Sequence, residues 1–516
     1  MNSDKTKHAV KNTVSGLVYK LLRIIMQFVI RTILILKLGM EYAGLNSLFT
    51  SILQVLSFSE LGFASVIAFT MYKPIVDEDE VMVRALLNFV RKVYYVVGAV
   101  ILVAGCVLMP FLPNLISGSY PSDINLYLLY LIYLGNTVIS YLFFAYKRIL
   151  LTAYQRSDVE NRVMTFCEIV MYVAQIAALL LYPNYYVYII FLPLCTLGIN
   201  FVCYYRVNKL FPSCKAEGNL SRVQQKAIYK HIFSLVGHRI SIVVVNSFVS
   251  IIVSATLGLE LLAIYNNYYY VINSCMAIMI VVYTSITAGV GTSMASESVQ
   301  KNYNDFKTLT FVNVWMVGFM AIAILCLFQP FMVLWLGEES LLPDYSAFLF
   351  VLLFYFWRFK DMVSTFKDAG GLWKEDFWKP YTISLVSLVL ALVLVRIDGI
   401  NGVIYSLIVG VFIISMPWET HALFKAYFKI KTGAYYLRML IYTAIVFAVG
   451  ALAYYLCLLL PDGGIWWFMA RAGICCTIPN ILFLLFSFRT REFKVVWCKL
   501  KSLLRRRKSV DGSCGG

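Results

Sequence analysis

Four polar side chains lie within an apolar run of membrane-spanning length and could together bind an anion. They are Lys20, Arg23, Gln27 and Arg31, inside residues 12–38. Each residue of an α-helix advances about 100° around the axis, so the four positions fall within an arc of about 80° and a depth of about 16 Å. The sequence therefore predicts a polar stripe on an otherwise lipid-compatible helix.

Three cations on one span need compensation inside the protein. Each cation near the centre of a bilayer costs about 2.5 to 3.5 kcal/mol on insertion scales. Water and an anion would supply the compensation, since guanidinium forks suit phosphate and the amide of Gln27 can bond phosphate or sugar hydroxyls. A structural alternative is that Lys20 extends to the cytoplasmic interface while Arg31 pairs with Glu60 on the next span.

The composition indicates a polytopic membrane protein. Of the 516 residues, 61% are hydrophobic and 14% are charged, whereas soluble domains average about 25% charged residues. Runs of about 20 apolar residues predict an all-α protein with about fourteen transmembrane helices. We place these spans at residues 12–38, 44–72, 85–112, 124–146, 162–182, 185–205, 232–257, 261–291, 309–331, 345–366, 380–396, 402–419, 438–460 and 464–488.

Lys and Arg gather on alternate connections between the spans, which predicts the orientation. The connection at residues 206–230 is rich in both, whereas the loops near 113–124, 332–344 and 461–463 contain neither. Because basic residues favour the cytoplasmic side, we expect both termini inside a bacterial cytoplasmic membrane. The net charge of +17 then follows from topology, and nucleic acid is not an expected partner.

An internal repeat organises the chain. Leu38-Gly39-Met40-Glu41 recurs as Leu257-Gly258-Leu259-Glu260, each just past a span that leaves the cytoplasm. In that register Lys20 matches Arg239 and Gln27 matches Asn246, so we add Arg239 and Asn246 to the candidate substrate-binding residues. Six spans separate the copies, which predicts parallel repeats.

We therefore expect two six-helix lobes around a central cavity, followed by two additional helices. The expected boundaries are an N-lobe at residues 1–206, a cytoplasmic linker at 207–230, a C-lobe at 231–420, spans 13 and 14 at 421–488, and a basic cytoplasmic tail at 489–516. The tail mixes Trp and Leu with Lys and Arg up to residue 508, which is typical of a helix lying on anionic lipids.

The N-terminal motifs carry a family resemblance. Residues 31–49 (RTILILKLGMEYAGLNSLF), 56–65 (LSFSELGFAS) and 71–74 (MYKP) resemble the signature of Wzx-type polysaccharide flippases, which transport O-antigen or capsule repeat units. These belong to the multidrug/oligosaccharidyl-lipid/polysaccharide exporter superfamily. The resemblance implies inner-to-outer leaflet transfer of a polyprenyl-diphosphate-linked oligosaccharide by alternating access, alongside other polysaccharide-assembly membrane proteins.

Buried acids are candidates for ion coupling. Glu60 and Glu168 lie within predicted spans, where an acid is costly unless it is paired or protonated. Either could bind a proton or sodium ion, although a structural ion pair is the favoured interpretation for Glu60. Asp361 lies beside Arg358 and Lys360, and we interpret this cluster first as a satisfied local network and second as a gate.

Several patterns exclude other functions. The sequence has no GxxxxGK[ST] loop, its four His residues form no cluster, and its twelve Cys residues have no metal-type spacing and are interpreted as packing residues. We expect that the protein is not an enzyme and that it needs no metal or cofactor. Transport could be coupled to a proton or sodium gradient. Two alternatives stay open: a polymerase or ligase of lipid-linked sugars, which would need a large outer loop, and a multidrug exporter, which would favour acidic cavity residues.

Two runs rich in tyrosine lie near the predicted outer ends of spans. Residues 185–188 and 265–270 are rich in Tyr, a residue that favours the headgroup region. We expect them to form part of an interfacial aromatic belt.

Overall fold

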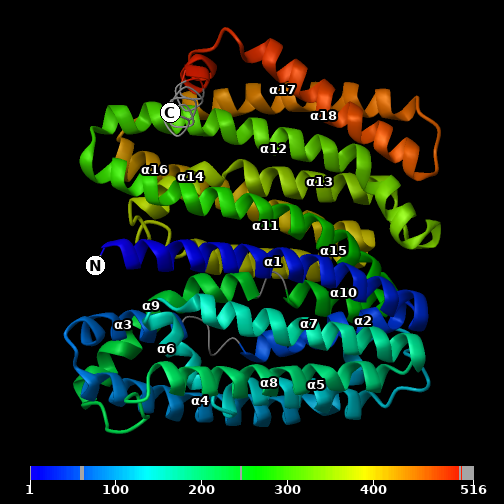
Figure 1. Ribbon diagram of the computed structural model, residues 1–516. Coiled ribbons are helices and arrows are strands. Elements are labelled where there is room, and N and C mark those ends of the chain that lie inside the picture. The colour runs from blue at the N-terminus through cyan, green and yellow to red at the C-terminus, as the bar shows by residue number, and fades with distance from the viewer. Residues whose placement is uncertain (1, 58–62, 244–246, 499–500, 502–516) are drawn as a thin grey trace, which may run out of the picture. The chain divides into compact units, whose positions relative to one another are not determined.

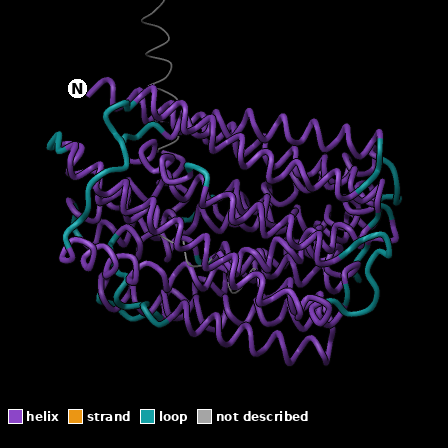
Figure 2. Tube along the Cα trace, turned by 90° about the horizontal axis from the view of Figure 1, so that it is seen from below, coloured by secondary structure: helices purple, strands orange, loops and turns teal. Residues whose placement is uncertain are grey.

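The computed structural model describes residues 2–57, 63–243, 247–498 and 501, and all of its regular structure in these ranges is helical (Figure 2). The chain divides into two compact units, residues 1–266 and 267–516. The predicted linker, residues 207–230, lies within the first of these units, and the predicted lobe boundaries stay a prediction.

The first unit is built from long helices with short connections (Figure 1). Its helices are α1 (Asn2–Leu38), α2 (Met40–Leu56), α3 (Phe63–Val76), α4 (Glu80–Leu108), η2 (Met109–Leu115), α5 (Leu126–Leu142), η3 (Ala145–Lys147), α6 (Arg148–Ala153), α7 (Ser157–Leu181), α8 (Tyr185–Leu210), α9 (Arg222–Val243) and α10 (Val249–Leu257). Helix α11 (Leu259–Ser296) begins in this unit and continues into the second.

The second unit surrounds α12, which packs against α13, α17 and α18. Its further helices are α12 (Val299–Leu336), η5 (Glu338–Ser340), α13 (Asp344–Phe359), α14 (Asp361–Ala369), α15 (Lys379–Ile408), η6 (Val409–Ser415), α16 (Met416–Leu423), η7 (Phe424–Phe428), α17 (Gly433–Leu458) and α18 (Ile465–Ser487). Residues 491–498 add a short helix, which packs back on the unit through a stack of Phe493 on Trp315.

Most predicted spans fall on these helices, and spans 44–72 and 232–257 also contain residues 58–62 and 244–246, which lie outside the described residues. Among the described residues, eight helices are long and apolar enough to cross a membrane, or nine if Leu126–Leu142 and Ala145–Ala153 form one span bent by 50°. Predicted spans 380–396 and 402–419 run together in α15 and its continuation, but the backbone turns between them at Asp398 (φ −135°) and Gly399 (φ 51°). Asp398 and Gly399 thus lie where the hydropathy pattern places the connection.

Local sequence explains where helices begin and end. Asp79, Asn125, Asn184 and Ser298 cap α4, α5, α8 and α12 by accepting hydrogen bonds from backbone amides of the first turn. Gly39 (φ 111°, ψ 173°) and Gly258 (φ 90°, ψ 175°) end α1 and α10 in nearly the same backbone conformation, and each amide bonds to the carbonyl four residues earlier. Only glycine adopts this conformation without strain, so the repeated four-residue motif encodes a repeated helix break.

Candidate functional site

The polar stripe predicted for residues 12–38 lies on α1, which runs beside α7 in the first unit (Figure 1). The opposite face of α1, about 160° around the axis, is apolar and exposed. That face consists of Val18, Leu21, Ile25, Val29 and Leu36. Helix α1 therefore separates a lipid-compatible face from a polar one.

The N-terminal half of the stripe is accessible. Lys20 and Arg23 are both exposed, and the described part of the chain gives Lys20 no hydrogen-bond or ion-pair partner. The Arg23 Nη1 atom donates to the Tyr19 hydroxyl at 3.4 Å, and the Tyr19 hydroxyl donates to Glu168 Oε1 at 2.8 Å. Glu168 on α7 thus reaches the Arg23 guanidinium through one tyrosine.

The C-terminal half of the stripe is occupied by the protein itself. Gln27 and Arg31 are half-buried, and the Arg31 Nη2 atom donates to the backbone carbonyl of Ala263, near the start of α11, at 3.2 Å. Gln27 lies beside the hydroxyl of Tyr172 on α7. The four predicted residues therefore separate into two exposed cations and two residues that hold helices together.

Three predicted site residues cannot be evaluated from their side chains. Glu60 and Asn246 lie outside the described residues. Arg239 lies within α9, where only the helix is described. The proposed pairing of Arg31 with Glu60 and the second-lobe cation at Arg239 therefore remain predictions.

The exposed pair has the chemistry of an anion site. Lys20 and Arg23 are three residues apart on one helix, so their side chains project from neighbouring positions of the same face. An ammonium and a guanidinium in this arrangement supply two positive charges and several donors, which suits two linked phosphate groups. Within the described part of the chain, the Arg23 guanidinium donates to Tyr19, which is itself bonded to Glu168, and its other donors make no hydrogen bond.

The tyrosines predicted to lie in an interfacial belt are mostly inside the protein. Tyr185 and Tyr188 are buried, and Tyr185 shares a hydrogen bond of 2.9 Å with Tyr133, which also donates to Asn46 at 2.6 Å. Tyr265 and Tyr268 are buried as well. The belt prediction is wrong for these four residues, because their hydroxyl groups find partners or cover inside the helical packing.

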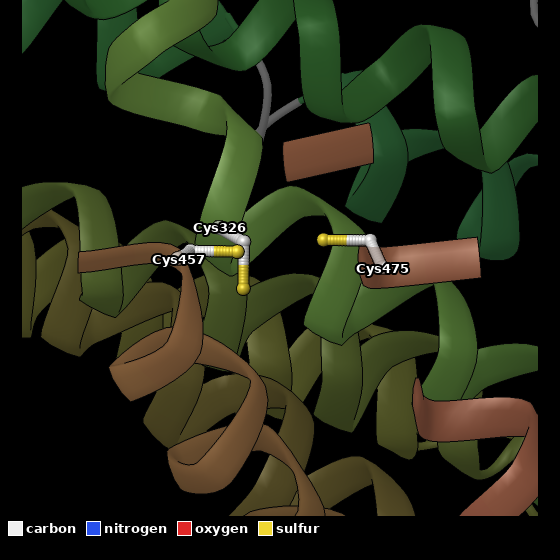
Figure 3. Close-up of side chains that lie close together, drawn as sticks. All are labelled: Cys326, Cys457 and Cys475. Atoms are coloured by element: carbon white, nitrogen blue, oxygen red, sulfur yellow. The ribbon is translucent and has the colours of Figure 1, made fainter. Parts of the chain in front are cut away.

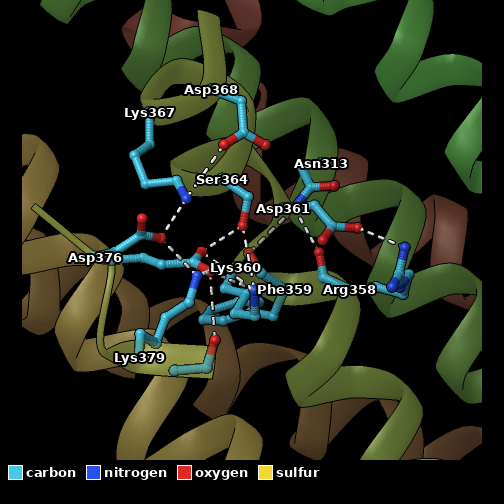
Figure 4. Close-up of polar contacts among 12 residues, drawn as sticks. Asn313, Arg358, Phe359, Lys360, Asp361, Ser364, Lys367, Asp368, Asp376 and Lys379 are labelled. Atoms are coloured by element: carbon cyan, nitrogen blue, oxygen red, sulfur yellow. Dashed lines mark hydrogen bonds and ion pairs between the residues drawn. The ribbon is translucent and has the colours of Figure 1, made fainter. Parts of the chain in front are cut away.

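A buried ion network lies in the second unit, where α13, α14, α15 and α16 meet (Figure 4). Arg358 pairs with Asp361 at 2.9 Å, as the sequence indicates. Lys360 lies 3.1 Å from the carboxylate of Glu419, which Lys379 and Ser364 also contact. Residues from four helices form this network, whereas the sequence analysis predicted only the local cluster of Arg358, Lys360 and Asp361.

Asp376 is a further buried acid of this network, beside Asp361 and Glu419. It is fully buried and pairs with both Lys367 and Lys379. Burial opposes its ionisation, but Lys379 and Lys367 outweigh this effect and lower the pKa of the Asp376 carboxyl below its ordinary value. The pKa of Lys367 is raised, because Glu419, Asp368 and Asp376 outweigh the opposing effect of burial.

The sequence interpretation missed Glu419 and Asp376 as partners of these lysines. Glu419 lies 59 residues from Lys360 and 40 from Lys379, and no sequence spacing connects positions so far apart. A signal was nevertheless present: Glu419 is an acid at the end of predicted span 402–419, and an acid there needs a partner.

Comparisons with solved structures identify the fold. The structure of a lipid II flippase, MurJ, in an inward closed conformation matches 92% of this chain and 98% of its own with a TM-score of 0.64 at 14% identity. An inward-facing multidrug resistance MATE family transporter of the MOP superfamily matches 81% of this chain and 98% of its own with a TM-score of 0.61 at 12% identity. A eukaryotic MATE transporter matches 82% of this chain and 97% of its own, with a TM-score of 0.55 and 12% identity.

The chain has the same fold as these transporters. This confirms the all-helical, multi-pass membrane architecture, and the matched proteins are transporters rather than enzymes. No family model matches the chain, and no curated protein matches it in sequence. At these identities the comparisons establish the fold and leave the substrate to be argued from the residues.

Proposed function

We propose that this protein is a flippase that moves a polyprenyl-diphosphate-linked oligosaccharide from the inner to the outer leaflet of a bacterial cytoplasmic membrane. Transfer by alternating access would serve the biosynthesis of cell-surface polysaccharide. The observation that carries the proposal is the exposed Lys20–Arg23 pair on the polar face of α1, in a fold that a lipid II flippase shares over nearly its whole length.

The sign of the charge favours this substrate class. A lipid diphosphate with attached sugars cannot cross hydrocarbon unaided, because its charged groups would lose water without gaining partners. Lys20 and Arg23 supply partners of opposite charge. A multidrug exporter is a second candidate because the MATE structures share the fold, but cationic drugs would be repelled by this pair.

The connections between helices argue against a polymerase or ligase. On the predicted outer side, the chain passes from α12 to α13 through residues 337–343, and from α17 to α18 through residues 459–464. Gly39 alone separates α1 from α2. Connections of this length hold no separate domain for catalysis on the outer surface.

The decisive experiment follows the cargo in cells that carry a depletable copy of the gene. Lipid-linked oligosaccharide is labelled with a radioactive sugar, and spheroplasts are treated with an impermeant glycan-oxidising reagent. We expect depletion to leave the labelled lipid unreactive on the inner leaflet. Accumulation of reactive lipid on the outer leaflet would instead identify a polymerase or ligase, and unchanged lipid pools would contradict both assignments.

A further inference from the structure

Three buried cysteines from three helices of the second unit converge at one point. Cys326 of α12, Cys457 of α17 and Cys475 of α18 have their sulfur atoms within 4.8 Å of one another. All three are buried, with 4%, 3% and 1% of their surfaces exposed. Figure 3 shows the side chains of Cys457 and Cys475 pointing toward each other, with Cys326 beside them.

A buried cation lies beside these thiols. Arg471, on α18 one turn before Cys475, is 6% exposed, and its Nε atom donates to the backbone carbonyl of Cys457 at 3.3 Å. Its Nη2 atom donates to the carbonyl of Leu460 at 3.0 Å and pairs with Asp462 at 2.6 Å. Because the Asp462 side chain is almost fully exposed, water screens that acid, while the buried guanidinium stays bonded to the backbone of Cys457. A positive charge in this place favours thiolates.

The cluster is accessible from a cavity. A cavity of about 710 Å³ lies among α12, α13, α17 and α18, and its lining includes Cys326, Cys457 and Arg471. A small ion can therefore reach Cys326 and Cys457 from this cavity, and protons can leave through it, without unfolding of the helices.

We propose that Cys326, Cys457 and Cys475 bind one soft metal ion, monovalent copper, in a three-sulfur site. A metal–sulfur bond of about 2.3 Å in a trigonal arrangement places the sulfurs about 4 Å apart, which the cluster reaches by small side-chain movements. Thiolates select soft ions such as Cu(I) and also Zn(II). Structural zinc takes four ligands, whereas in the described part of the chain only these three Cys, His, Asp or Glu residues converge here.

Copper binding releases protons and changes the charge of the site. If all three thiols deprotonate, three protons leave and the copper–thiolate group carries a net charge of −2, of which Arg471, which also pairs with Asp462, offsets a part. Metal affinity rises with pH because the ligands must lose protons. Since the ligands come from α12, α17 and α18, the bound ion ties the last two long helices to α12.

The test uses the purified full-length protein in detergent, reduced and kept under anaerobic conditions. Cu(I) is titrated in competition with a chromophoric copper chelator. We expect one equivalent of Cu(I) to bind and to raise the thermal unfolding temperature, since a ligand that binds only the folded state stabilises it. Separate Cys326→Ser, Cys457→Ser and Cys475→Ser substitutions should each weaken binding at least about tenfold. The control, Cys476→Ser, changes an exposed neighbour in the same helix and should bind as the unaltered protein does.

X-ray absorption on the copper-loaded, unaltered protein provides a measurement that does not depend on the folding of a variant. Three sulfur neighbours around copper would support the site. No saturable Cu(I) binding, or binding that survives all three Ser substitutions together, would show that the thiols only pack. Preferential binding of Zn(II) with a fourth ligand would overturn the assignment to copper.

Discussion

Arg23 is the residue on which the proposed substrate contact depends most. Arg23→Ala removes a charge-assisted hydrogen bond of about 1.5 to 3 kcal/mol, which corresponds to a roughly ten- to hundredfold loss of substrate binding. Arg23→Lys should partly restore binding because it keeps the charge but loses the fork, and Arg23→Glu should be worse than Ala. Binding of a lipid diphosphate to purified protein measures the effect. Arg206→Ala, an exposed arginine of α8, is the control, and equal losses in both variants would contradict the assignment.

Glu168 is a candidate for ion coupling from the sequence, and its contact with Tyr19 leads us to propose that it positions Arg23 instead. If so, Tyr19→Phe and Glu168→Gln should weaken transport similarly, by about fivefold for a lost hydrogen bond of about 1 kcal/mol, and both should keep the dependence on the ion gradient. Transport into proteoliposomes, with and without a proton or sodium gradient, separates the roles. Loss of gradient dependence in Glu168→Gln alone would restore the coupling role.

Asp376 makes stability depend on pH in a defined direction. Its folded-state pKa is lowered below the ordinary 3.8, so its contribution is fully present above that value and is lost as the pH falls through the folded-state pKa. Asp376→Asn should lower the free energy of unfolding by about 3 to 5 kcal/mol, because it leaves buried Lys367 and Lys379 without their shared acid. Thermal unfolding in detergent between about pH 7 and pH 3 measures this difference. Asp368→Asn is the control, since Asp368 is half-exposed and should change stability by less than about 1 kcal/mol.

At the element scale, Gly44 has less space for a side chain than any other glycine that is described in the first unit, because α2 meets the start of α11 there. A Cβ at Gly44 would overlap the backbone carbonyl of Leu259, whereas one at Gly135 of α5 would meet nothing within 4 Å. Gly44→Ala should therefore separate the two helices and lower thermal stability and membrane accumulation, while Gly135→Ala should leave both nearly unchanged. Equal behaviour of the two variants in a thermal shift assay and in membrane fractions would show that the α2–α11 contact is not tight.

The helices were predictable from sequence because a bilayer imposes length and hydropathy on each span, and because glycines such as Gly39 and Gly258 encode local breaks. The contacts between helices were not predictable in the same way. The buried partners Lys379 and Glu419 lie on α15 and α16, and the three clustered cysteines lie on three helices. Neither group has a spacing that one helix would reveal. The stripe itself was predicted, but its division into exposed Lys20 and Arg23 and half-buried Gln27 and Arg31 depends on α7 and α11.

For the whole molecule, the fold shared with the lipid II flippase structure defines the architecture, and the distribution of Lys and Arg predicts which ends of the helices face the cytoplasm. Single cysteines are introduced into a background without native cysteines and treated with a membrane-impermeant thiol reagent in intact cells. We expect labelling at Ser119 and Glu339, which are exposed on connections free of basic residues, and none at Ser221 and Lys431, which are exposed on the basic side. Permeabilised cells, in which all four should react, provide the control. Labelling of Ser221 and Lys431 in intact cells would reverse the orientation, and the Lys20–Arg23 end of α1 would then face the outer leaflet, where it could not receive a lipid diphosphate made in the cytoplasm.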